Sequence, residues 1–163
     1  MLMRAWILKV VCVFFLTSAV TAQEQIDYSH SDAYARLYLE QSFSSLAPHT
    51  TDDITFVDRF AQTEGRTTTL KGFANRADTS PVAFKSFTLG TPLYSGNRML
   101  YPSRIVFTLP AEAFGVEGEA FTFDVPMTLL IRIKDNLVSY HEDIMDVPEF
   151  QKQMREQIAA RGS

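Results

Sequence analysis

The sequence predicts an α+β fold, in which a strongly curved antiparallel sheet wraps around helices and forms a cone-shaped cavity. Three observations predict it. The chain has 163 residues, a length typical of a single domain. The region from Pro81 to Met145 consists of extended segments separated by turns, and segments with helical spacing of apolar residues lie on both sides of it. Helices kept apart from a long sheet are typical of this fold class.

Residues 1–22 have the three parts of a secretory signal peptide. Arg4 and Lys9 form a positive start, an apolar run follows, and Val20-Thr21-Ala22 supplies the small residues of a cleavage site. The apolar run is about half of the ~20 residues that a membrane helix requires. We therefore expect cleavage after Ala22, export to the periplasm or the extracellular space, and no stable membrane anchor after cleavage. An uncleaved N-terminal anchor is the alternative.

Cleavage changes the composition of the chain. Removing 22 of the 163 residues leaves 141, and losing Arg4 and Lys9 lowers the net charge from −4 to −6. The single Cys and the single Trp, Cys12 and Trp6, both lie in the signal. Disulfides, thiol catalysis and Cys-based metal sites are therefore excluded in the mature chain. The acidic balance excludes a general nucleic-acid partner, because such proteins need a basic surface.

A first helix is predicted after a polar, unstructured lead-in over residues 23–30. Ser31-Asp32 is typical of a helix N-cap, because a side-chain oxygen there accepts from free N–H groups of the first turn. Tyr34 and Tyr38 lie on the apolar stripe of this helix, which is expected to run through Leu46.

Two further helices are predicted on either side of the sheet region. Thr67 to Ala77 is a weak helix former because of its threonines and a glycine. Asp146 and Glu149 have the spacing of an N-cap and its reciprocal acid. We expect this terminal helix to run to about Ile158, so that residues 151–163 form a helical tail.

The clearest strand signal is Phe121–Ile133, in which every odd position is apolar. This period of two indicates a strand with one buried face. Two earlier strands are predicted at Phe84–Leu89 and Met99–Leu109. Asp135-Asn136 indicates a tight hairpin turn into a last strand over Leu137–Ile144.

Asp58 is the most informative candidate for chemistry. A short strand is predicted over Ile54–Phe60, where alternation places Asp58 on the same face as apolar neighbours, namely Ile54, Phe56 and Phe60. A carboxylate on an apolar face is desolvated, which suits it to proton transfer near neutral pH. The structural alternative is a carboxylate paired with a backbone N–H or with a nearby arginine, Arg66 or Arg76.

The tyrosines of the first helix are the second candidate group, because a phenol packs its ring and directs its hydroxyl into a cavity. The alternative is an ordinary aromatic core. The side chains expected to line the pocket are Tyr38, Phe56, Phe60, Phe123, Met127, Leu129 and Ile131.

The pair His141 and Asp143 shares one face of the last strand and offers a base with an orienting carboxylate. Tyr140 and Ile144 lie on the opposite face and look like its buried set, so the sequence favours a solvent-facing His–Asp pair. The three histidines of the chain show no metal-ligand spacing, and no cofactor-binding motif is present. We expect neither a metal nor a cofactor.

Three segments resemble the SnoaL-like branch of the nuclear transport factor 2-like superfamily. Thr51–Asp58 is similar to the turn with paired acids that leads into the first strand of those proteins. Glu64-Gly65-Arg66 is similar to the entry of their middle helix, and Ile133–Phe150 to their last hairpin and its closing Asp. The resemblance covers about residues 31–150, which defines the expected SnoaL-like domain.

The resemblance implies a cone-like α+β fold, often a dimer packed through its sheet. Such proteins include isomerases, cyclases, dehydratases and epoxide hydrolases of small molecules, together with non-enzymatic binding modules. In the ketosteroid-isomerase-like members, a carboxylate base matches Asp58 and a tyrosine on the first helix matches Tyr34.

The leading hypothesis is therefore an exported protein that binds a small hydrophobic molecule. In its catalytic form, Asp58 moves a proton while Tyr34 polarises a carbonyl or hydroxyl. The competing hypothesis is a non-catalytic module that carries a ligand or forms a homodimer through its sheet. This alternative is favoured by the inward face of Phe121–Ile133, which carries no second acid.

Overall fold

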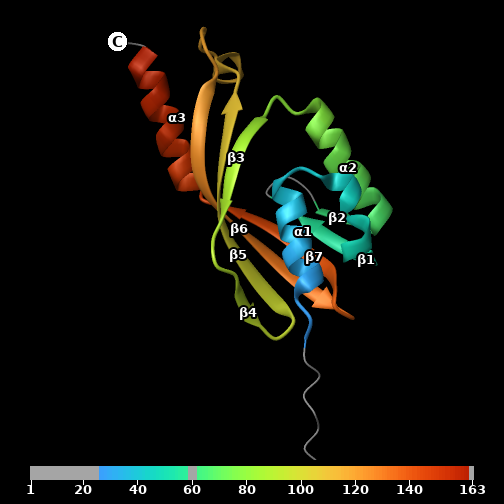
Figure 1. The fold of residues 1–163 in the computed structure, drawn as a ribbon. Helices are drawn as coiled ribbons and strands as arrows, with labels where there is room; N and C mark the ends of the chain where they lie inside the picture. The colour runs from blue at the N-terminus through green and yellow to red at the C-terminus, as the bar shows by residue number, and fades with distance from the viewer. Residues whose placement is uncertain (1–25, 59–61, 162–163) are drawn as a thin grey trace, which may run out of the picture.

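The computed structural model describes residues 26–58 and 62–161. The predicted signal peptide and the predicted pocket residue Phe60 lie outside the described residues. Figure 1 shows the order of the elements along the chain. The helices are α1 (Ser29–Leu39), α2 (Arg66–Thr79) and α3 (Val147–Arg161), with 3-10 turns η1 (Phe43–Ser45), η2 (Ala47–His49) and η3 (Ala111–Phe114). The strands are β1 (Thr50–Val57), β2 (Gln62–Glu64), β3 (Ala83–Leu89), β4 (Leu93–Ser95), β5 (Arg98–Leu109), β6 (Phe121–Lys134) and β7 (Leu137–Met145).

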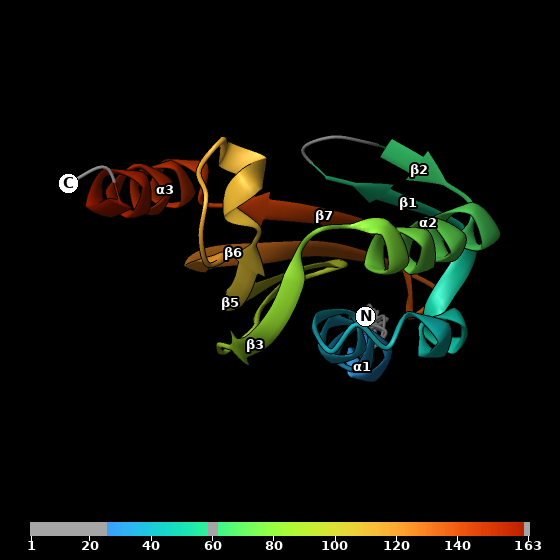
Figure 2. The same cartoon turned by 90° about the horizontal axis from the view of Figure 1, so that it is seen from above.

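The strands form one curved, unclosed sheet in the order β2-β1-β7-β6-β5-β3, with β4 paired to β5. Seen from above, the sheet curves around α1 and α2, which lie on its concave side (Figure 2). The predicted α+β class is confirmed. The sheet is mixed rather than wholly antiparallel, because β1 pairs in parallel with β7. Local patterning does not reveal this, since β1 and β7 are far apart in the chain and pair only in the folded sheet.

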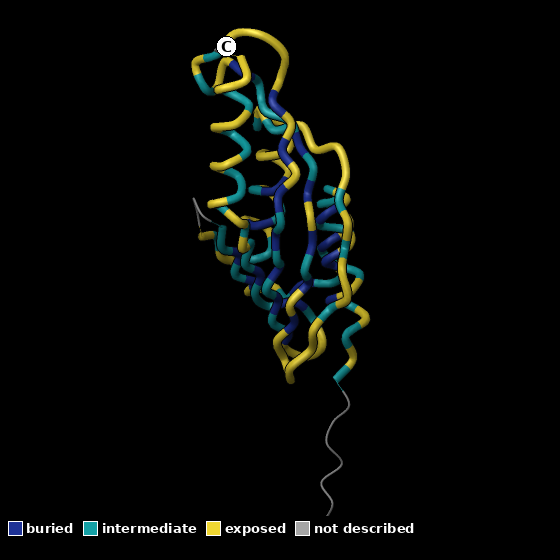
Figure 3. Tube along the Cα trace, turned by 90° about the vertical axis from the view of Figure 1, so that its left-hand side faces the viewer, coloured by how far each residue is buried: buried dark blue, intermediate teal, exposed yellow. Residues whose placement is uncertain are grey.

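Strand β6 is the centre of the core and follows the predicted alternation. Its burial alternates along its length, and every odd position from Phe121 to Ile133 is buried. Buried residues concentrate along the strands in Figure 3, while the loops and most of α3 are exposed or intermediate. The hairpin turn at Asp135 and Asn136 has positive φ at both residues, 52° and 62°. These φ values are typical of a two-residue type I′ turn, and they confirm the predicted tight hairpin turn.

Helix α1 ends at Leu39, seven residues before the predicted end at Leu46. The N–H of Ser42 donates to the carbonyl of Leu37 at 2.9 Å, and the N–H of Gln41 donates to the carbonyl of Tyr38 at 3.0 Å. Gln41 has φ 57°, so these bonds form a Schellman motif with a glutamine in the left-handed position. The motif satisfies the last carbonyls of the helix and turns the chain away, which sequence periodicity does not reveal.

The start of α1 also differs from the prediction. The helix begins at Ser29, so Ser29 and His30 are helical rather than part of the lead-in. Ser31 is buried inside the helix, where its hydroxyl donates to the carbonyl of Tyr28 at 2.8 Å. Asp32 accepts the hydroxyl of Tyr101 at 2.8 Å. Asp32 therefore attaches α1 to β5 instead of capping the helix, and Ser31 bonds within the start of α1.

The other two helices agree with their predicted positions and are longer. The α2 helix extends past the predicted Thr67–Ala77 at both ends. The carboxylate of Asp146 accepts the N–H of Glu149 at 3.0 Å, which confirms the predicted N-cap of α3. No helix of the part of the chain that the structure describes is long and apolar enough to span a membrane.

Strand β7 contains a bulge that matters for the site. Arg132 of β6 pairs with Tyr140, whereas the next residue, Ile133, pairs with Val138, so Ser139 is the extra residue. An extra residue reverses the alternation of side chains beyond it. Val138 points into the core on one side of the bulge, and His141 points into it on the other.

Candidate functional site

A cavity of about 900 Å³ lies between the concave face of the sheet and the helices. Its walls come from α1, η1, α2, several strands and the start of α3. Most of the lining side chains are apolar, and rings such as Phe43, Phe73 and Phe107 contribute a large share. The lining also includes charged groups, on Asp58, Arg76, Glu142 and Asp143.

Asp58 lies directly after the end of β1 and lines this cavity. Its side chain is 9% exposed, and Oδ2 lies 2.5 Å from Nη1 of Arg76 on α2. Of the two arginines that the sequence offers as partners, Arg76 is therefore the one that pairs with Asp58. Arg66 instead forms an ion pair with Asp52 and donates to the carbonyl of Ala47 at 3.1 Å.

Four side chains from α1 and β7 form a hydrogen-bonded chain that leads to the cavity wall. The Tyr34 hydroxyl lies 2.9 Å from Nδ1 of His141. Nε2 of the same ring lies 3.0 Å from Oδ1 of Asp143. The hydroxyl of Tyr38 donates to Oδ2 of Asp143 at 2.5 Å. Tyr34 and His141 are fully buried, whereas Tyr38 and Asp143 line the cavity.

One assignment of protons satisfies every group in this chain. The Tyr34 hydroxyl donates to Nδ1 of His141. The imidazole carries its proton on Nε2 and donates it to Asp143. Tyr38 donates to the second carboxylate oxygen. Both oxygens of Asp143 are thus bound from the protein side, which fixes the orientation of this carboxylate at the cavity wall.

Burial raises the pKa of both phenols in the chain well above their ordinary value of 10.0, and the negative charge of Asp143 raises these pKa values further. For Tyr38, the hydrogen bond to Asp143 contributes in the same direction, while the Arg76 charge opposes it. The two tyrosines therefore remain proton donors across the neutral range.

The Asp58–Arg76 pair and the Tyr38–Asp143 pair both lie next to the buried ring of Phe56. The guanidinium of Arg76 lies 5.4 Å from the centre of the Phe56 ring. That ring is 6.2 Å from the ring of Tyr38 and 5.0 Å from that of His141. The two polar pairs are thus connected through one buried ring, that of Phe56.

The predicted site residues separate into two groups. Asp58, Tyr38 and Met127 line the cavity. The remaining described ones are buried in the core and are not part of the cavity wall, namely Tyr34, Phe56, Phe123, Leu129 and Ile131. Alternation along a strand predicts which face is inward but not how much of it α1 covers. Here α1 packs against β6 and β7, so part of the inward face becomes core.

The favoured solvent-facing position of the His141–Asp143 pair is wrong. His141 is fully buried and the Asp143 side chain is 15% exposed. Ile144, expected on the buried face, is 46% exposed. The bulge at Ser139 is the cause, because it reverses the alternation that Val138 begins. The sequence signal for such a bulge is a strand in which apolar residues occur on both alternating sets of positions, so that no single face is wholly apolar.

Asp143 also supplies the second acid that the inward face of β6 lacks. It pairs with Leu129 in the sheet register, so it projects beside the apolar strand from the neighbouring one. A search for a second acid on Phe121–Ile133 alone therefore does not find Asp143, which lies on the neighbouring strand.

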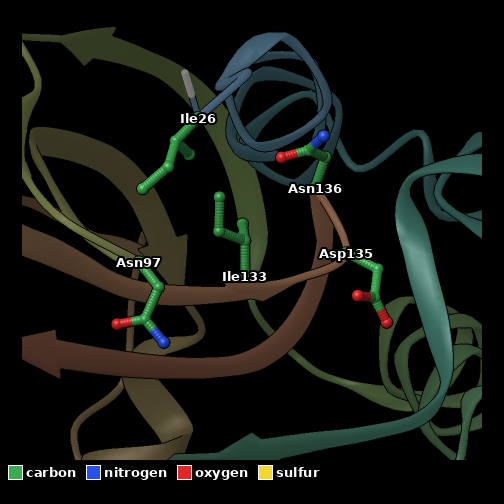
Figure 4. A pocket seen from close by; sticks show the side chains of 5 residues that line it. All are labelled: Ile26, Asn97, Ile133, Asp135 and Asn136. Carbon is green, nitrogen blue, oxygen red and sulfur yellow. The ribbon is translucent and has the colours of Figure 1, made fainter. Parts of the chain in front are cut away.

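A second pocket, of about 190 Å³, lies at the far end of the β6–β7 hairpin. Figure 4 shows Ile26 and Ile133 between Asn97 and the turn at Asp135 and Asn136. Its volume is about a fifth of that of the main cavity. Within residues 26–58 and 62–161, no group of three or more His, Cys, Asp or Glu side chains is arranged to hold a metal ion.

Solved structures with the same architecture are numerous. A proposed SnoaL-like polyketide cyclase from Shewanella putrefaciens CN-32 superimposes with a TM-score of 0.61 at 17% identity, covering 78% of this chain and 94% of its own. An LEH-like epoxide hydrolase from M. tuberculosis gives 0.60 at 13% identity, with 82% and 92% covered. A protein with a ketosteroid isomerase-like fold from Catenulispora acidiphila DSM 44928, in complex with trimethylamine, gives 0.60 at 17% identity, with 77% and 91% covered.

The architecture is therefore the cone-shaped α+β fold of the nuclear transport factor 2-like superfamily, and the SnoaL-like resemblance of the sequence is confirmed at the level of the fold. No protein-family model matches the sequence, and no curated protein matches it either. Sequence identities of 13–17% to these structures show a shared fold alone.

Proposed function

We propose that this protein is exported, binds a small hydrophobic molecule in the main cavity and transfers a proton within it. The observation that carries the proposal is the placement of two carboxylates, Asp58 and Asp143, on the wall of a mostly apolar cavity of about 900 Å³. Ligand pockets commonly have volumes of ~300–1,000 Å³, apolar walls and a few converging polar groups.

The two carboxylates have different surroundings and therefore suit different roles. Asp58 accepts the proton, and the adjacent Arg76 guanidinium stabilises the negative charge that develops on the ligand oxygen. Asp143 is oriented by Tyr38 and His141 and forms the second polar contact of the ligand. Tyr34 acts through His141 as a positioning residue rather than as the direct donor that the sequence predicts.

The reaction class that fits is an isomerisation, cyclisation or hydrolysis, because each needs a base beside a polarising donor and no redox group. The names of the structural neighbours, cyclases and an epoxide hydrolase-like protein, support this range of chemistry without selecting one member of it.

The first experiment identifies the occupant of the cavity. The protein is purified without denaturation and examined by native mass spectrometry, followed by extraction of the bound molecule. The catalytic proposal is then tested on a panel of ketones, epoxides and lactones. Asp58→Asn is expected to abolish turnover, and Asp143→Asn to reduce it. Asp78→Asn, an exposed carboxylate on the same helix as Arg76, is the matched control and should leave turnover unchanged.

A second candidate function, ligand binding without catalysis, is favoured by one observation. Asp58 is held by Arg76, and both oxygens of Asp143 already accept hydrogen bonds. A wild-type protein that retains a ligand but turns over no member of the panel, with Asp58→Asn binding it equally well, identifies the binding module. Homodimer formation remains a prediction, and light scattering on the purified protein measures it.

Export is tested separately from the chemistry. Cleavage after Ala22 predicts a secreted form that begins at Gln23 and lacks tryptophan absorbance, because Trp6 is removed. N-terminal sequencing of the protein from the periplasmic and culture fractions checks this. An intact residue 1 in the exported fraction contradicts cleavage.

A further inference from the structure

The charges of the described residues that line the cavity do not balance. Among the lining residues within the described ranges, three are acids and one is a base: Asp58, Glu142 and Asp143 against Arg76. Arg76 forms an ion pair with Asp58, in which Nη1 of the guanidinium lies 2.5 Å from Oδ2 of the carboxylate. One ion pair therefore accounts for the only guanidinium in this set, and two carboxylates remain.

The contacts of the remaining carboxylates come from groups that add hydrogen bonds without adding a guanidinium or an ammonium. Glu142 accepts the hydroxyl of Tyr140 at 2.8 Å. Asp143 accepts the hydroxyl of Tyr38 at 2.5 Å and faces Nε2 of His141 at 3.0 Å. Hydroxyl donors and a neutral imidazole satisfy lone pairs but leave the carboxylate charge in place. Burial is the largest cause of the raised pKa of Tyr38, and the negative charge of Asp143 is the next largest.

Asp143 is joined through the Tyr38 hydroxyl to a group of aromatic rings. The rings of Tyr38 and Phe43 have centroids 5.9 Å apart, and each lies 5.3 Å from the ring of Phe73. All three line the cavity, so they form one continuous aromatic wall that ends at the Tyr38–Asp143 contact. The face of an aromatic ring carries negative potential and attracts cations, and a carboxylate at its edge strengthens that attraction.

We propose that the ligand of the cavity is an apolar molecule with a cationic nitrogen, a protonated amine or a quaternary ammonium, seated at Asp143 against the aromatic wall of Tyr38, Phe43 and Phe73. This inference rests on the proposed function of the cavity and adds the chemical class of the ligand. The apolar remainder of the molecule extends along the side chains of β3 and β5 that line the rest of the space, such as Phe84, Ile105 and Phe107. A carboxylate-bearing ligand of the same length is disfavoured, because its charge meets that of Asp143.

The test compares probes that differ only in the head group: octylamine, octyltrimethylammonium, 1-octanol and octanoate, measured by isothermal titration calorimetry on the full chain at neutral pH and low salt. The two cations are expected to bind about tenfold tighter than octanol, which corresponds to one charge contact of this kind, and octanoate is expected to bind most weakly. Asp143→Asn should remove the preference for the cations. Asp78→Asn should keep it.

A second measurement needs no variant and therefore does not depend on whether Asp143→Asn folds. The affinity of the wild-type protein for octylamine should fall as sodium chloride is added, while that for octanol should not. Equal binding of all probes, or tighter binding of octanoate, overturns the inference but leaves the cavity as an apolar ligand site. If none of the probes binds, the proposed function of the cavity fails together with the inference.

Discussion

The side-chain amide of Gln153 on α3 forms two hydrogen bonds with the backbone of one residue of β6, Asp124, and its nitrogen also donates to Glu149 at 2.9 Å. Its oxygen accepts the Asp124 N–H at 3.0 Å, and its nitrogen donates to the Asp124 carbonyl at 2.7 Å. One helical turn later, Gln157 repeats this arrangement with Thr122, at 3.0 Å and 2.8 Å. Two glutamines thus pair with the part of β6 that extends beyond β7, as a neighbouring strand would.

This pairing predicts the effect of changing an amide to an acid. Gln153→Glu replaces the donating nitrogen by an oxygen that faces the Asp124 carbonyl, so the free energy of unfolding should fall by about 1 kcal/mol. Urea unfolding followed by circular dichroism measures the change. Gln151→Glu adds the same charge at an exposed position of α3 and is expected to cost much less. Equal losses for the two variants would mean that the amide pairing contributes nothing.

The end of α1 provides a second prediction. Gln41 occupies the left-handed region with φ 57°, where a side chain is disfavoured by roughly 1 kcal/mol and glycine is not. Gln41→Gly is therefore expected to raise the midpoint of thermal unfolding. Glu40→Gly is the matched control, because Glu40 has φ −74° and glycine there only adds freedom to the unfolded chain. That variant should lower the midpoint, and a decrease for both would show that Gln41 is not strained.

The third prediction concerns alkaline pH. Burial and the charge of Asp143 hold the pKa of Tyr34 well above 10.0 in the folded protein. As the pH rises above 10, the unfolded chain releases this proton while the folded protein keeps it. The contribution of Tyr34 is therefore fully present below pH 10 and is lost above it, at up to about 1.4 kcal/mol per pH unit.

Tyr34→Phe tests this directly through unfolding curves recorded from neutral to alkaline pH. At neutral pH the variant should be less stable by about 1–3 kcal/mol, because Nδ1 of His141 loses its buried donor. The gap to the wild-type protein should narrow above pH 10. A gap that stays constant across this range would contradict a raised pKa for Tyr34.

The cap of α3 provides a fourth prediction. Asp146→Ala removes the acceptor of the Glu149 N–H and should cost about 1 kcal/mol of unfolding free energy. Asp146→Asn retains a capping oxygen and is expected to cost only a few tenths of this. Hydrogen exchange at the first amides of α3 should be faster in the alanine variant alone, and unchanged protection there would speak against the cap.

Local patterning predicts those parts of the fold that depend on residues close together in the chain. The alternation in Phe121–Ile133 predicts a strand whose odd positions are all buried. Asp135-Asn136 predicts a tight hairpin turn, because these residues tolerate positive φ. Asp146 predicts the start of α3, because the capping bond spans only three residues.

The site was only partly predictable. Side-chain periodicity predicts Asp58 and Tyr38 as site residues, and both line the cavity. Asp143 was assigned to the wrong face, since the bulge at Ser139 depends on how β7 pairs with β6. Tyr34 was expected to reach the ligand, but its hydroxyl is bound by His141, a residue 107 positions away in the chain.

By itself, the sequence determined the fold class, the apolar face of the sheet and the acids available for chemistry, because these follow from side-chain period, turn propensity and composition. Only the tertiary structure decided which acids meet at the cavity and what holds them. The pairing of β1 with β7, the bulge in β7 and the closure of α1 over the sheet join residues far apart in the chain. Their geometry is set by packing and backbone hydrogen bonds across the whole domain, and no local pattern records it.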